Sequence, residues 1–375
     1  MKVAIDIRNL VEETLTGIGY YTQSLVSELV THSSIEWYLF YNQGKRAKEP
    51  DILQKLESLP HVHIIRTRYP NKLFNLLLCL GLVSLDRVVC SRAGIEKLDW
   101  IFFPNLGFIS VSKKTKVMLA VHDLTFARFK QYYSLKRLWW HALLQPGRLI
   151  ARANTIITPS RSTKEDLSLL YSVDHARVRV VPHGGLTEEV EIGEKEPLSE
   201  SRKRYFLALA TIEPRKNFEG IIAAYKESGL HTQGVELIIC GALGWRYRES
   251  VQKFNTTPGV IYRGYVDHAE KKKLLSGALA LVYPSYYEGF GLPILEAFGY
   301  GIPVITGDRS SLLEVCDGAA YLVRPHITSD ITHAMRDLAH SSELREWYAA
   351  KGRERAGKFS WGVASDTVLK LLHNF

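Results

Sequence analysis

The sequence predicts an α/β protein of two domains, each a parallel sheet covered by helices. Short apolar runs alternate with helical patterns along the chain, which is the order of strand–helix–strand units in parallel sheets. The 375 residues exceed an average single domain and suit two. Residues 188–203 are charged and lack apolar periodicity, so we expect them to form a linker.

The composition is typical of a globular protein, because 46% of the residues are hydrophobic and 23% charged. No apolar run approaches the roughly 20 residues that span a bilayer. The cysteines at positions 79, 90, 240 and 316 lack the spacing of a metal site, and we expect reduced thiols in a cytoplasmic protein. The segment Met1–Asp6 carries an acid in its apolar run, so no signal peptide is expected.

The net charge of +9 is unevenly distributed. Between Leu124 and Lys164 there are eight lysines or arginines and no acidic residue. This asymmetry indicates an anionic partner for the first half: a membrane surface, a nucleic acid or a charged substrate. No recognition motif accompanies the basic residues, which argues against a nucleic acid.

Two segments of the first half combine apolar residues with nearby basic ones. Residues 73–85 are nearly all apolar, and they form either a core helix or an interfacial helix. Residues 132–153 mix tryptophan and leucine with lysine and arginine. Read as a helix, this second segment is either a solvated helix on the sheet or a docking surface for an anionic membrane.

The first strand, residues 2–7, is followed by Thr16-Gly17-Ile18-Gly19 and then by a helical pattern. A strand, a glycine loop and a helix open a parallel α/β domain. The loop has two of the three glycines of a dinucleotide fingerprint, so Gly17 and Gly19 indicate either nucleotide binding or close packing of helix on strand. The further strands expected in this half are residues 37–41, 63–66, 100–103, 116–121, 155–160 and 178–181.

His122 directly follows the expected strand 116–121 and precedes Asp123. Ligands of α/β proteins bind at the carboxyl ends of the strands, so His122 is well placed for chemistry. A lone histidine is more often structural than catalytic, but the strand end and the following acid make the two interpretations about equal, and both stay open.

The second half repeats the alternation of strands and helices, and it ends in an amphipathic helix over residues 360–375. Its most informative stretch is residues 284–304, where a glycine loop leads into a helix with Pro293 near its first position. A helix N-terminus of this kind favours phosphate. The loop carries Glu288 and the helix Glu296, although an ordinary crossover with tight turns would also need the glycines. The expected strands of this half are residues 205–209, 236–240, 260–263, 278–283 and a strand from Pro303 onward.

Taken together, the loops resemble those of the family 4 retaining glycosyltransferases with two Rossmann-like domains, the GT-B architecture. The residues that carry the resemblance are Thr16–Gly19, His122-Asp123, Pro214-Arg215-Lys216-Asn217, Gly264-Tyr265-Val266, the paired glutamates Glu288 and Glu296, and Phe359-Ser360-Trp361. The order and spacing match over nearly the whole chain. Within the family, the chain is similar to bacterial mannosyltransferases of O-antigen and exopolysaccharide synthesis. One departure is Ala210-Thr211, where the family usually has Gly-Thr.

The resemblance implies a role for each matching residue. Arg215 and Lys216 would neutralise the donor diphosphate, His122 would lie near the transferred sugar, and Glu288 would face that sugar or its phosphate. These residues are the expected catalytic set, and no metal ligand is expected. The expected donor-binding residues are Gly17, Gly19, Arg215, Lys216, Tyr265, Val266, Glu288, Gly289, Phe290, Gly291, Leu292 and Glu296, the last of them at the ribose hydroxyls.

The implied function is transfer of a hexose, mannose from GDP-mannose, to a hydroxyl group of a glycan or lipid-linked acceptor. The alternatives are a UDP-sugar-dependent glucosyl or N-acetylhexosaminyl transferase and a nucleotide-sugar epimerase of the same fold. The chain contains no Asp-x-Asp sequence, which favours a metal-independent reaction without a cofactor. A retaining glycosidase-like pair of carboxylates is not expected, since Glu296 is assigned to the ribose.

The resemblance also implies the domain organisation and the location. We expect an N-terminal acceptor domain at residues 1–187, the linker at 188–203, a donor domain at 204–358 and a C-terminal helix at 359–375 that packs toward the N-terminal domain. The two domains would face each other across a cleft. The expected location is the cytoplasm, with peripheral contact to the anionic inner face of the cytoplasmic membrane.

Overall fold

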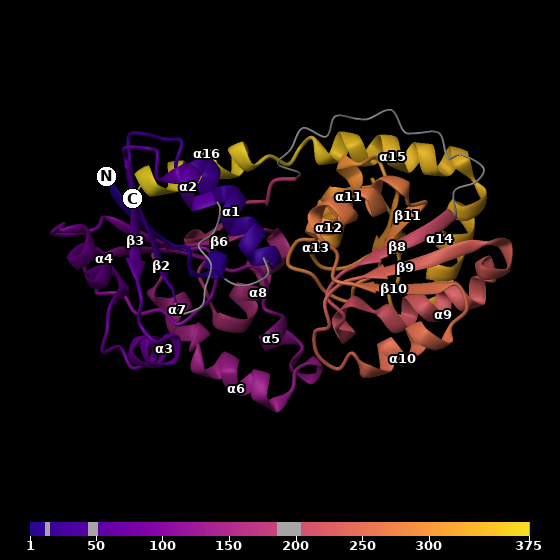
Figure 1. The fold of residues 1–375 in the computed structure, drawn as a ribbon, viewed down its shortest axis with the longest axis horizontal. Helices are drawn as coiled ribbons and strands as arrows, with labels where there is room; N and C mark the ends of the chain where they lie inside the picture. The colour runs from indigo at the N-terminus through magenta and orange to yellow at the C-terminus, as the bar shows by residue number, and fades with distance from the viewer. Residues whose placement is uncertain (12–15, 44–51, 186–203, 375) are drawn as a thin grey trace. The chain divides into compact units, whose positions relative to one another are not determined.

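The computed structural model describes residues 1–11, 16–43, 52–185 and 204–374, and the expected linker at 188–203 lies outside these ranges. The chain forms two compact units. The first comprises Met1–Lys130, Leu135–Gly184 and Ser360–Phe375, and the second comprises Gln131–Ser134 and Gly185–Phe359. Each unit is built on its own parallel sheet (Figure 1).

The sheet of the first unit has the strand order β3-β2-β1-β4-β5-β6-β7, and all its pairings are parallel. Chain order reverses beside β1, so the carboxyl ends of β1 and β4 border a switch point of the kind that binds ligands. The strands are β1 (Lys2–Asp6), β2 (Glu36–Asn42), β3 (Val62–Thr67), β4 (Trp100–Phe103), β5 (Lys116–Ala120), β6 (Thr155–Thr158) and β7 (Val178–Val180).

Helices cover both faces of this sheet. They are α1 (Gly17–Leu29), α2 (Ile52–Leu56), α3 (Asn71–Cys79), α4 (Leu85–Ala93), α5 (Thr125–Arg128), α6 (Leu135–Leu143), α7 (Pro146–Arg152), α8 (Arg161–Tyr171) and α16 (Trp361–His373). Short 3₁₀ turns are η1 (Arg8–Val11), η2 (Lys130–Tyr132) and η3 (His175–Arg177).

The sheet of the second unit has the order β10-β9-β8-β11-β12-β13 and is also parallel. Its strands are β8 (Arg204–Leu209), β9 (Val235–Cys240), β10 (Val260–Gly264), β11 (Ala280–Tyr283), β12 (Val304–Gly307) and β13 (Tyr321–Val323). Its helices are α9 (Phe218–Ser228), α10 (Arg248–Thr256), α11 (His268–Gly277), α12 (Leu292–Gly299), α13 (Ser311–Cys316), α14 (Thr328–His340) and α15 (Ser342–Ala356), with 3₁₀ turns η4 (Pro214–Lys216) and η5 (Leu230–Gln233).

The strands read as continuous apolar runs because both faces of each sheet are buried. In β8, Phe206 and Ala208 belong to one hydrophobic cluster, and Leu207 between them belongs to the cluster on the opposite face. All three side chains are fully buried. The Rossmann-like α/β fold expected from the sequence is confirmed, and the observed strand ends differ from the expected ones by at most two residues.

The first helix begins earlier than expected. Thr16 caps α1 by accepting a hydrogen bond from Gly19 N, so Gly17 and Gly19 lie in the first helical turn and not in a loop before it. Gly17 is exposed, and a Cβ added there would meet no atom within 4 Å. Packing therefore does not require glycine at this position.

Residues 73–85 and 132–153, the two segments of apolar and basic residues, do not each form one continuous helix. In α3, Phe74 and Leu78 are buried whereas Leu73 and Leu76 are more than half exposed. Residues 132–153 form two helices, because Gln145 adopts a left-handed conformation with φ 51° directly before Pro146. The helix α6 buries none of its residues. No helix within the described ranges has both the length and the apolar character needed to cross a membrane.

The C-terminal helix α16 packs against α1 in the first unit (Figure 1). Trp361 begins this helix, is buried, and stacks on His183 with ring centroids 5.9 Å apart. The neighbouring Gly184 approaches it so closely that an added Cβ would lie 2.5 Å from Trp361 N and 2.4 Å from its indole ring. Only glycine fits at this contact.

We therefore predict that Gly184→Ala destabilises the first unit. A Cβ at Gly184 must displace α16, and overpacking of this kind costs about 1–3 kcal/mol. Chemical denaturation monitored by tryptophan fluorescence measures the loss. Gly107→Ala is the matched control, since a Cβ at Gly107 would meet no atom within 4 Å and should leave the unfolding midpoint unchanged. Equal midpoints for the two variants would contradict the packing argument.

Candidate functional site

Three loops of the second unit meet at the carboxyl ends of neighbouring strands β8, β11 and β12. Asn217, in the loop after β8, contacts the loop after β11 and the segment after β13: its Nδ2 donates to Pro284 O at 3.2 Å and to Pro325 O at 2.6 Å, and its Oδ1 accepts from the Tyr286 hydroxyl at 2.8 Å. Asn217 is buried and has φ 59°, a left-handed conformation that asparagine adopts more readily than most residues. This single side chain fixes the loop after β8 against the loop after β11.

The fixed loops bring two cations and two carboxylates together in one buried cluster. Arg215 Nη1 and Lys216 Nζ each lie 2.6 Å from a different carboxylate oxygen of Glu288. Arg215 Nη2 lies 2.6 Å from Glu213 Oε1, and Lys216 Nζ also donates to the Tyr283 hydroxyl at 2.6 Å. The four charged side chains are at most 11% exposed. The formal charge of this cluster is zero.

The charges shift the pKa values of the cluster in different directions. Burial raises the pKa of Glu288, but Arg215 and Lys216 outweigh burial and lower it to about 2. For Glu213 burial prevails over the same two cations, and its pKa is raised. Burial together with Arg215 lowers the pKa of Lys216. Glu288 is thus the carboxylate that the cluster holds firmly ionised.

The backbone of Glu288 is held from the start of α13. Ser310 Oγ accepts from Glu288 N at 3.0 Å, and Ser311 Oγ donates to Glu288 O and Phe290 O, both at 2.9 Å. Ser310 has φ 50° and ψ −141°, a combination that is costly for a residue with a Cβ. Such strain is found where surrounding contacts impose a functional geometry, and here those contacts place the glutamate loop.

The second glutamate lies on the helix that follows. Glu296 is in α12 and pairs with Lys271 of α11, with Nζ 2.7 Å from Oε1. Gly291 precedes α12 with φ 116° and gives the helix no side-chain cap. After β10, Tyr265 is 60% exposed whereas Val266 is buried. Glu296 therefore has its own partner and does not join the Glu288 cluster.

His122 lies in the first unit, at the carboxyl end of β5. Its Nε2 is 2.7 Å from Pro104 O, and because a carbonyl oxygen only accepts, Nε2 carries the proton. The Tyr21 ring of α1 contacts it edge-on at 4.5 Å, and the His183 ring lies 5.3 Å away. Burial lowers the pKa of His122 and keeps the imidazole neutral. Nδ1 is consequently the nitrogen with an available lone pair.

The structure thus brings together Arg215, Lys216 and Glu288 and leaves Glu296 with Lys271. Gly17, Gly19 and His122 belong to the other unit. The sequence predicted no role for the residues that hold the cluster together, which are Glu213, Asn217, Tyr283, Ser310 and Ser311. Glu213 had a detectable signal, since it is an acid two and three residues before two cations, whereas the serines become informative only once strand order is known.

The chain was compared with known proteins, and two family models match it in succession. Residues 15–187 match the model "Glycosyltransferase Family 4", and residues 190–355 match "Glycosyl transferases group 1". O-antigen chain mannosyltransferase B of Escherichia coli is 27% identical over 92% of this chain and 93% of its own.

Solved structures share the fold over the whole chain. Sucrose-phosphate synthase of Thermosynechococcus elongatus has a TM-score of 0.74 at 18% identity and covers 100% of this chain and 98% of its own. The Anabaena protein HepE, solved with UDP and glucose, has a TM-score of 0.70 at 14% identity with both chains fully covered.

The fold is therefore that of the GT-B glycosyltransferases, with two Rossmann-like units. The chain belongs to the glycosyltransferases that join a family 4 domain to a group 1 domain, and its relatives include O-antigen mannosyltransferases. The family expected from the sequence is confirmed. The individual donor-site roles remain predictions.

The two carboxylates of the cluster should affect stability oppositely as pH falls. The pKa of Glu288 in the folded state, about 2, lies below the usual 4.5, so its stabilisation is full above pH 4.5 and is lost as pH falls through about 2. We predict that the difference in unfolding free energy between the wild type and Glu288→Gln, roughly 2–3 kcal/mol at pH 6, shrinks toward pH 2.5.

Glu213→Gln is the matched control, because the pKa of Glu213 is raised and not lowered. Ionised Glu213 costs stability above its folded pKa, so the wild type should gain stability relative to this variant as pH falls. Urea titrations of the three proteins between pH 2.5 and 6 measure both differences. If both differences in unfolding free energy changed with pH in the same direction, the cations would not stabilise ionised Glu288 more than ionised Glu213.

Proposed function

We propose that this glycosyltransferase moves mannose from GDP-mannose to a hydroxyl group of a glycan or lipid-linked oligosaccharide, with retention and without a metal ion. The observation that carries the proposal is the placement of Arg215 and Lys216 side by side at the carboxyl edge of the second sheet. Fixed cations at that position suit a diphosphate. The choice of mannose and of an O-antigen product follows the Escherichia coli relative.

The cluster explains how a dianionic group could enter a buried site. Glu288 pairs with both cations, which avoids two uncompensated buried charges. Diphosphate oxygens would share Arg215 and Lys216 with Glu288, and the guanidinium can bind two acceptors at once. Glu288 would then face the sugar or its phosphate, while Glu296, oriented by Lys271, would accept from the ribose hydroxyls.

Chemistry would proceed by substitution on one face of the sugar. The acceptor oxygen bonds to the anomeric carbon while the bond from that carbon to the β-phosphate oxygen breaks, and the acceptor proton moves to that phosphate oxygen. Arg215, Lys216 and the N-terminus of α12 would stabilise the charge on the leaving diphosphate. His122 would accept a hydrogen bond from a sugar hydroxyl at Nδ1, because its Nε2–H already donates to Pro104 O.

A UDP-sugar is the second candidate donor, because the HepE structure of the same fold was solved with UDP and glucose. A thermal-shift panel of GDP-mannose, UDP-glucose and ADP-glucose separates the bases, since a ligand that binds only the folded state raises stability with ln(1 + [L]/Kd). A shift with UDP-glucose and none with GDP-mannose would reject GDP-mannose. Full turnover in EDTA would support the metal-independent reaction.

We predict that Lys216→Ala lowers kcat/KM by about 10²–10³-fold, the usual effect of removing one charge-stabilising donor. Steady-state transfer from the donor that the panel selects measures the loss. Lys253→Ala is the matched control: Lys253 is a paired but exposed surface lysine of the same unit, and its removal should leave turnover within about twofold. Normal turnover of Lys216→Ala would disprove the diphosphate assignment.

We further propose that the first unit docks on an anionic membrane surface through α3 and α6, whose exposed apolar residues are Leu73, Leu76, Leu135, Trp139, Trp140 and Leu143. Lys72, Lys136 and Arg137 lie among them in sequence, which matches a surface that is both apolar and negatively charged. A lipid-linked acceptor would be reached from this position.

Binding to vesicles that contain phosphatidylglycerol should therefore be measurable by co-sedimentation at low salt and weaken as salt screens the charges. Trp139→Ala should reduce binding roughly tenfold, because the Trp139 side chain is 71% exposed and would enter the interface. Trp347→Ala, at a 48% exposed tryptophan of the second unit, should have no effect. Absence of binding at low salt would reject the membrane proposal.

A further inference from the structure

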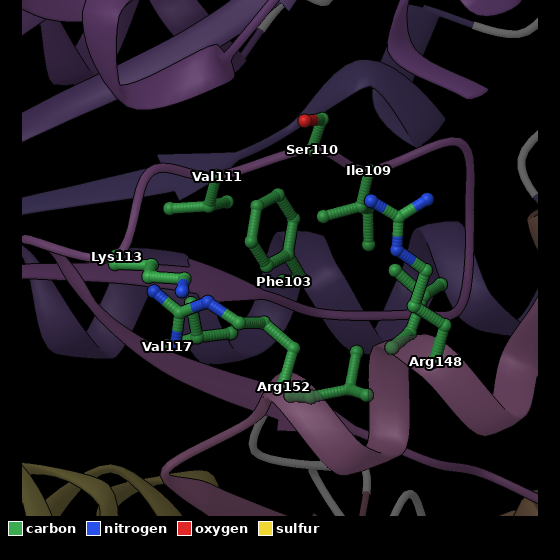
Figure 2. A pocket seen from close by; sticks show the side chains of 10 residues that line it. Phe103, Ile109, Ser110, Val111, Lys113, Val117, Arg148 and Arg152 are labelled. Carbon is green, nitrogen blue, oxygen red and sulfur yellow. The ribbon is translucent and has the colours of Figure 1, made fainter. Parts of the chain in front are cut away.

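The first unit contains a cavity of about 290 Å³ under the loop that joins β4 to β5 (Figure 2). Phe103 of β4 and Val117 and Leu119 of β5 form its apolar floor, and Leu149 of α7 lines it from the helix side. Its volume is close to the lower end of the range for small-molecule sites, about 300–1,000 Å³.

The cavity lies on the opposite face of the sheet from His122. Alternate residues of a strand point to opposite faces, and Met118 and Ala120 of β5 belong to the hydrophobic cluster that contains Tyr21 and Trp361. Val117 and Leu119 point the other way, into the cavity. The Tyr21 ring is the one that contacts His122, so this cavity and the His122 region are two separate places in the first unit.

Three cations and no carboxylate line the cavity: Lys113, Arg148 and Arg152. Figure 2 shows Lys113 and Arg152 at one end of the lining, Arg148 at the other, and the Phe103 ring between them. No ion pair to an acidic residue is recorded for any of the three within the described ranges. Three unbalanced positive charges around an apolar floor favour an anionic group in the space between them.

Backbone hydrogen bonds hold the Arg152 guanidinium in place at the cavity. Its Nη2 donates to Ser112 O at 2.6 Å and to Thr115 O at 2.7 Å, which ties α7 to the loop over the cavity. Its Nε is buried and has no hydrogen-bond partner among the described residues. The partial positive charge of this N–H is therefore not offset by an acceptor, which adds to the positive potential at this end of the cavity.

The surroundings of the cavity are apolar and exposed. Arg148 lies beside Gly81, since a Cβ added to this glycine would be 3.8 Å from Arg148 Nη2. The residues on either side of Gly81, Leu80 and Leu82, are 60% and 71% exposed. The Phe108 ring, in the loop over the cavity, contacts the exposed Trp140 of α6 edge-on at 6.2 Å. Cys79 Sγ donates to Leu143 O, which joins the end of α3 to α6. An exposed apolar surface therefore borders a positively charged cavity.

We propose that this cavity binds the phosphate headgroup of an anionic phospholipid, with the acyl chains on the apolar residues of α3 and α6. The phosphate oxygens would accept from Lys113 at the end of the cavity that also carries Arg152, Arg148 at the other end would attract the headgroup through its charge, and the first carbons of the lipid would contact Phe103, Val117 and Leu119. The inference rests on the proposed membrane docking and adds one defined lipid site to it.

Isothermal titration with dihexanoylphosphatidylglycerol below its micelle concentration tests the site without a membrane. We expect saturable one-site binding by the full chain, and about tenfold weaker binding after Lys113→Glu, the effect of losing one charge-assisted contact. Lys114→Glu is the matched control: it makes the same charge change at the adjacent exposed residue, which does not line the cavity, and should change affinity less than about twofold.

Three results would overturn the lipid site. Equal losses for Lys113→Glu and Lys114→Glu would show diffuse surface attraction. Equal affinity for inorganic phosphate would show a general anion site, and equal affinity for dihexanoylphosphatidylcholine would show a purely apolar one. Vesicle binding that survives these results leaves membrane docking intact, whereas soluble-lipid binding without vesicle binding rejects docking and retains the cavity site.

Discussion

The second unit depends on charge compensation inside a buried cluster. Arg215, Lys216, Glu213 and Glu288 are nearly inaccessible to water, and each would be costly to bury alone. Together they form two carboxylates facing two cations at 2.6 Å, which lowers the pKa of Glu288 to about 2 in spite of burial. A substrate anion that enters this cluster adds negative charge to a neutral group, so it must compete with Glu288 or share its partners.

That cluster exists only because the loops after β8, β11 and β12 are held in one arrangement. Neighbouring parallel strands end at the same edge, which brings the loops together, but the edge alone does not set their conformations. Asn217 binds the loop after β11 and Pro325 after β13, and Ser310 and Ser311, which follow β12, fix the backbone of Glu288. The positive φ of Asn217 and of Ser310 is the conformational cost of this arrangement.

The strands were predictable from the sequence because both faces of each sheet are buried, which leaves continuous apolar runs such as residues 100–103 and 280–283. The short strand β13 and the helices α13 to α15 were not assigned, since β13 has only three residues and one of them is exposed. The break at Gln145 was missed although Pro146, directly after it, disfavours a continuous helix and is visible in the sequence.

The sequence predicted which charged residues belong to the site but not which of them form ion pairs with each other. The motif residues Arg215, Lys216 and Glu288 are in contact, but Glu213 as a second counter-ion and Lys271 as the partner of Glu296 depend on strand order and helix orientation. Periodicity also could not decide between a buried and an interfacial α3. The structure shows both in one helix, with Phe74 and Leu78 against the core and Leu73 and Leu76 exposed.

The cations that contribute to the +9 net charge have different surroundings in the two units. In the second unit, Arg215 and Lys216 are balanced by carboxylates within hydrogen-bond distance, so their field is largely cancelled a few ångströms away. In the first unit, residues 124–164 carry eight cations without one acid. Arg128 is paired with Asp166, but the segment keeps a net positive charge. A net charge acts over roughly a Debye length, about 8–10 Å at physiological salt, which suits attraction to an extended anionic surface. Cations that are already paired suit a ligand that binds at close range and shares them with the carboxylate.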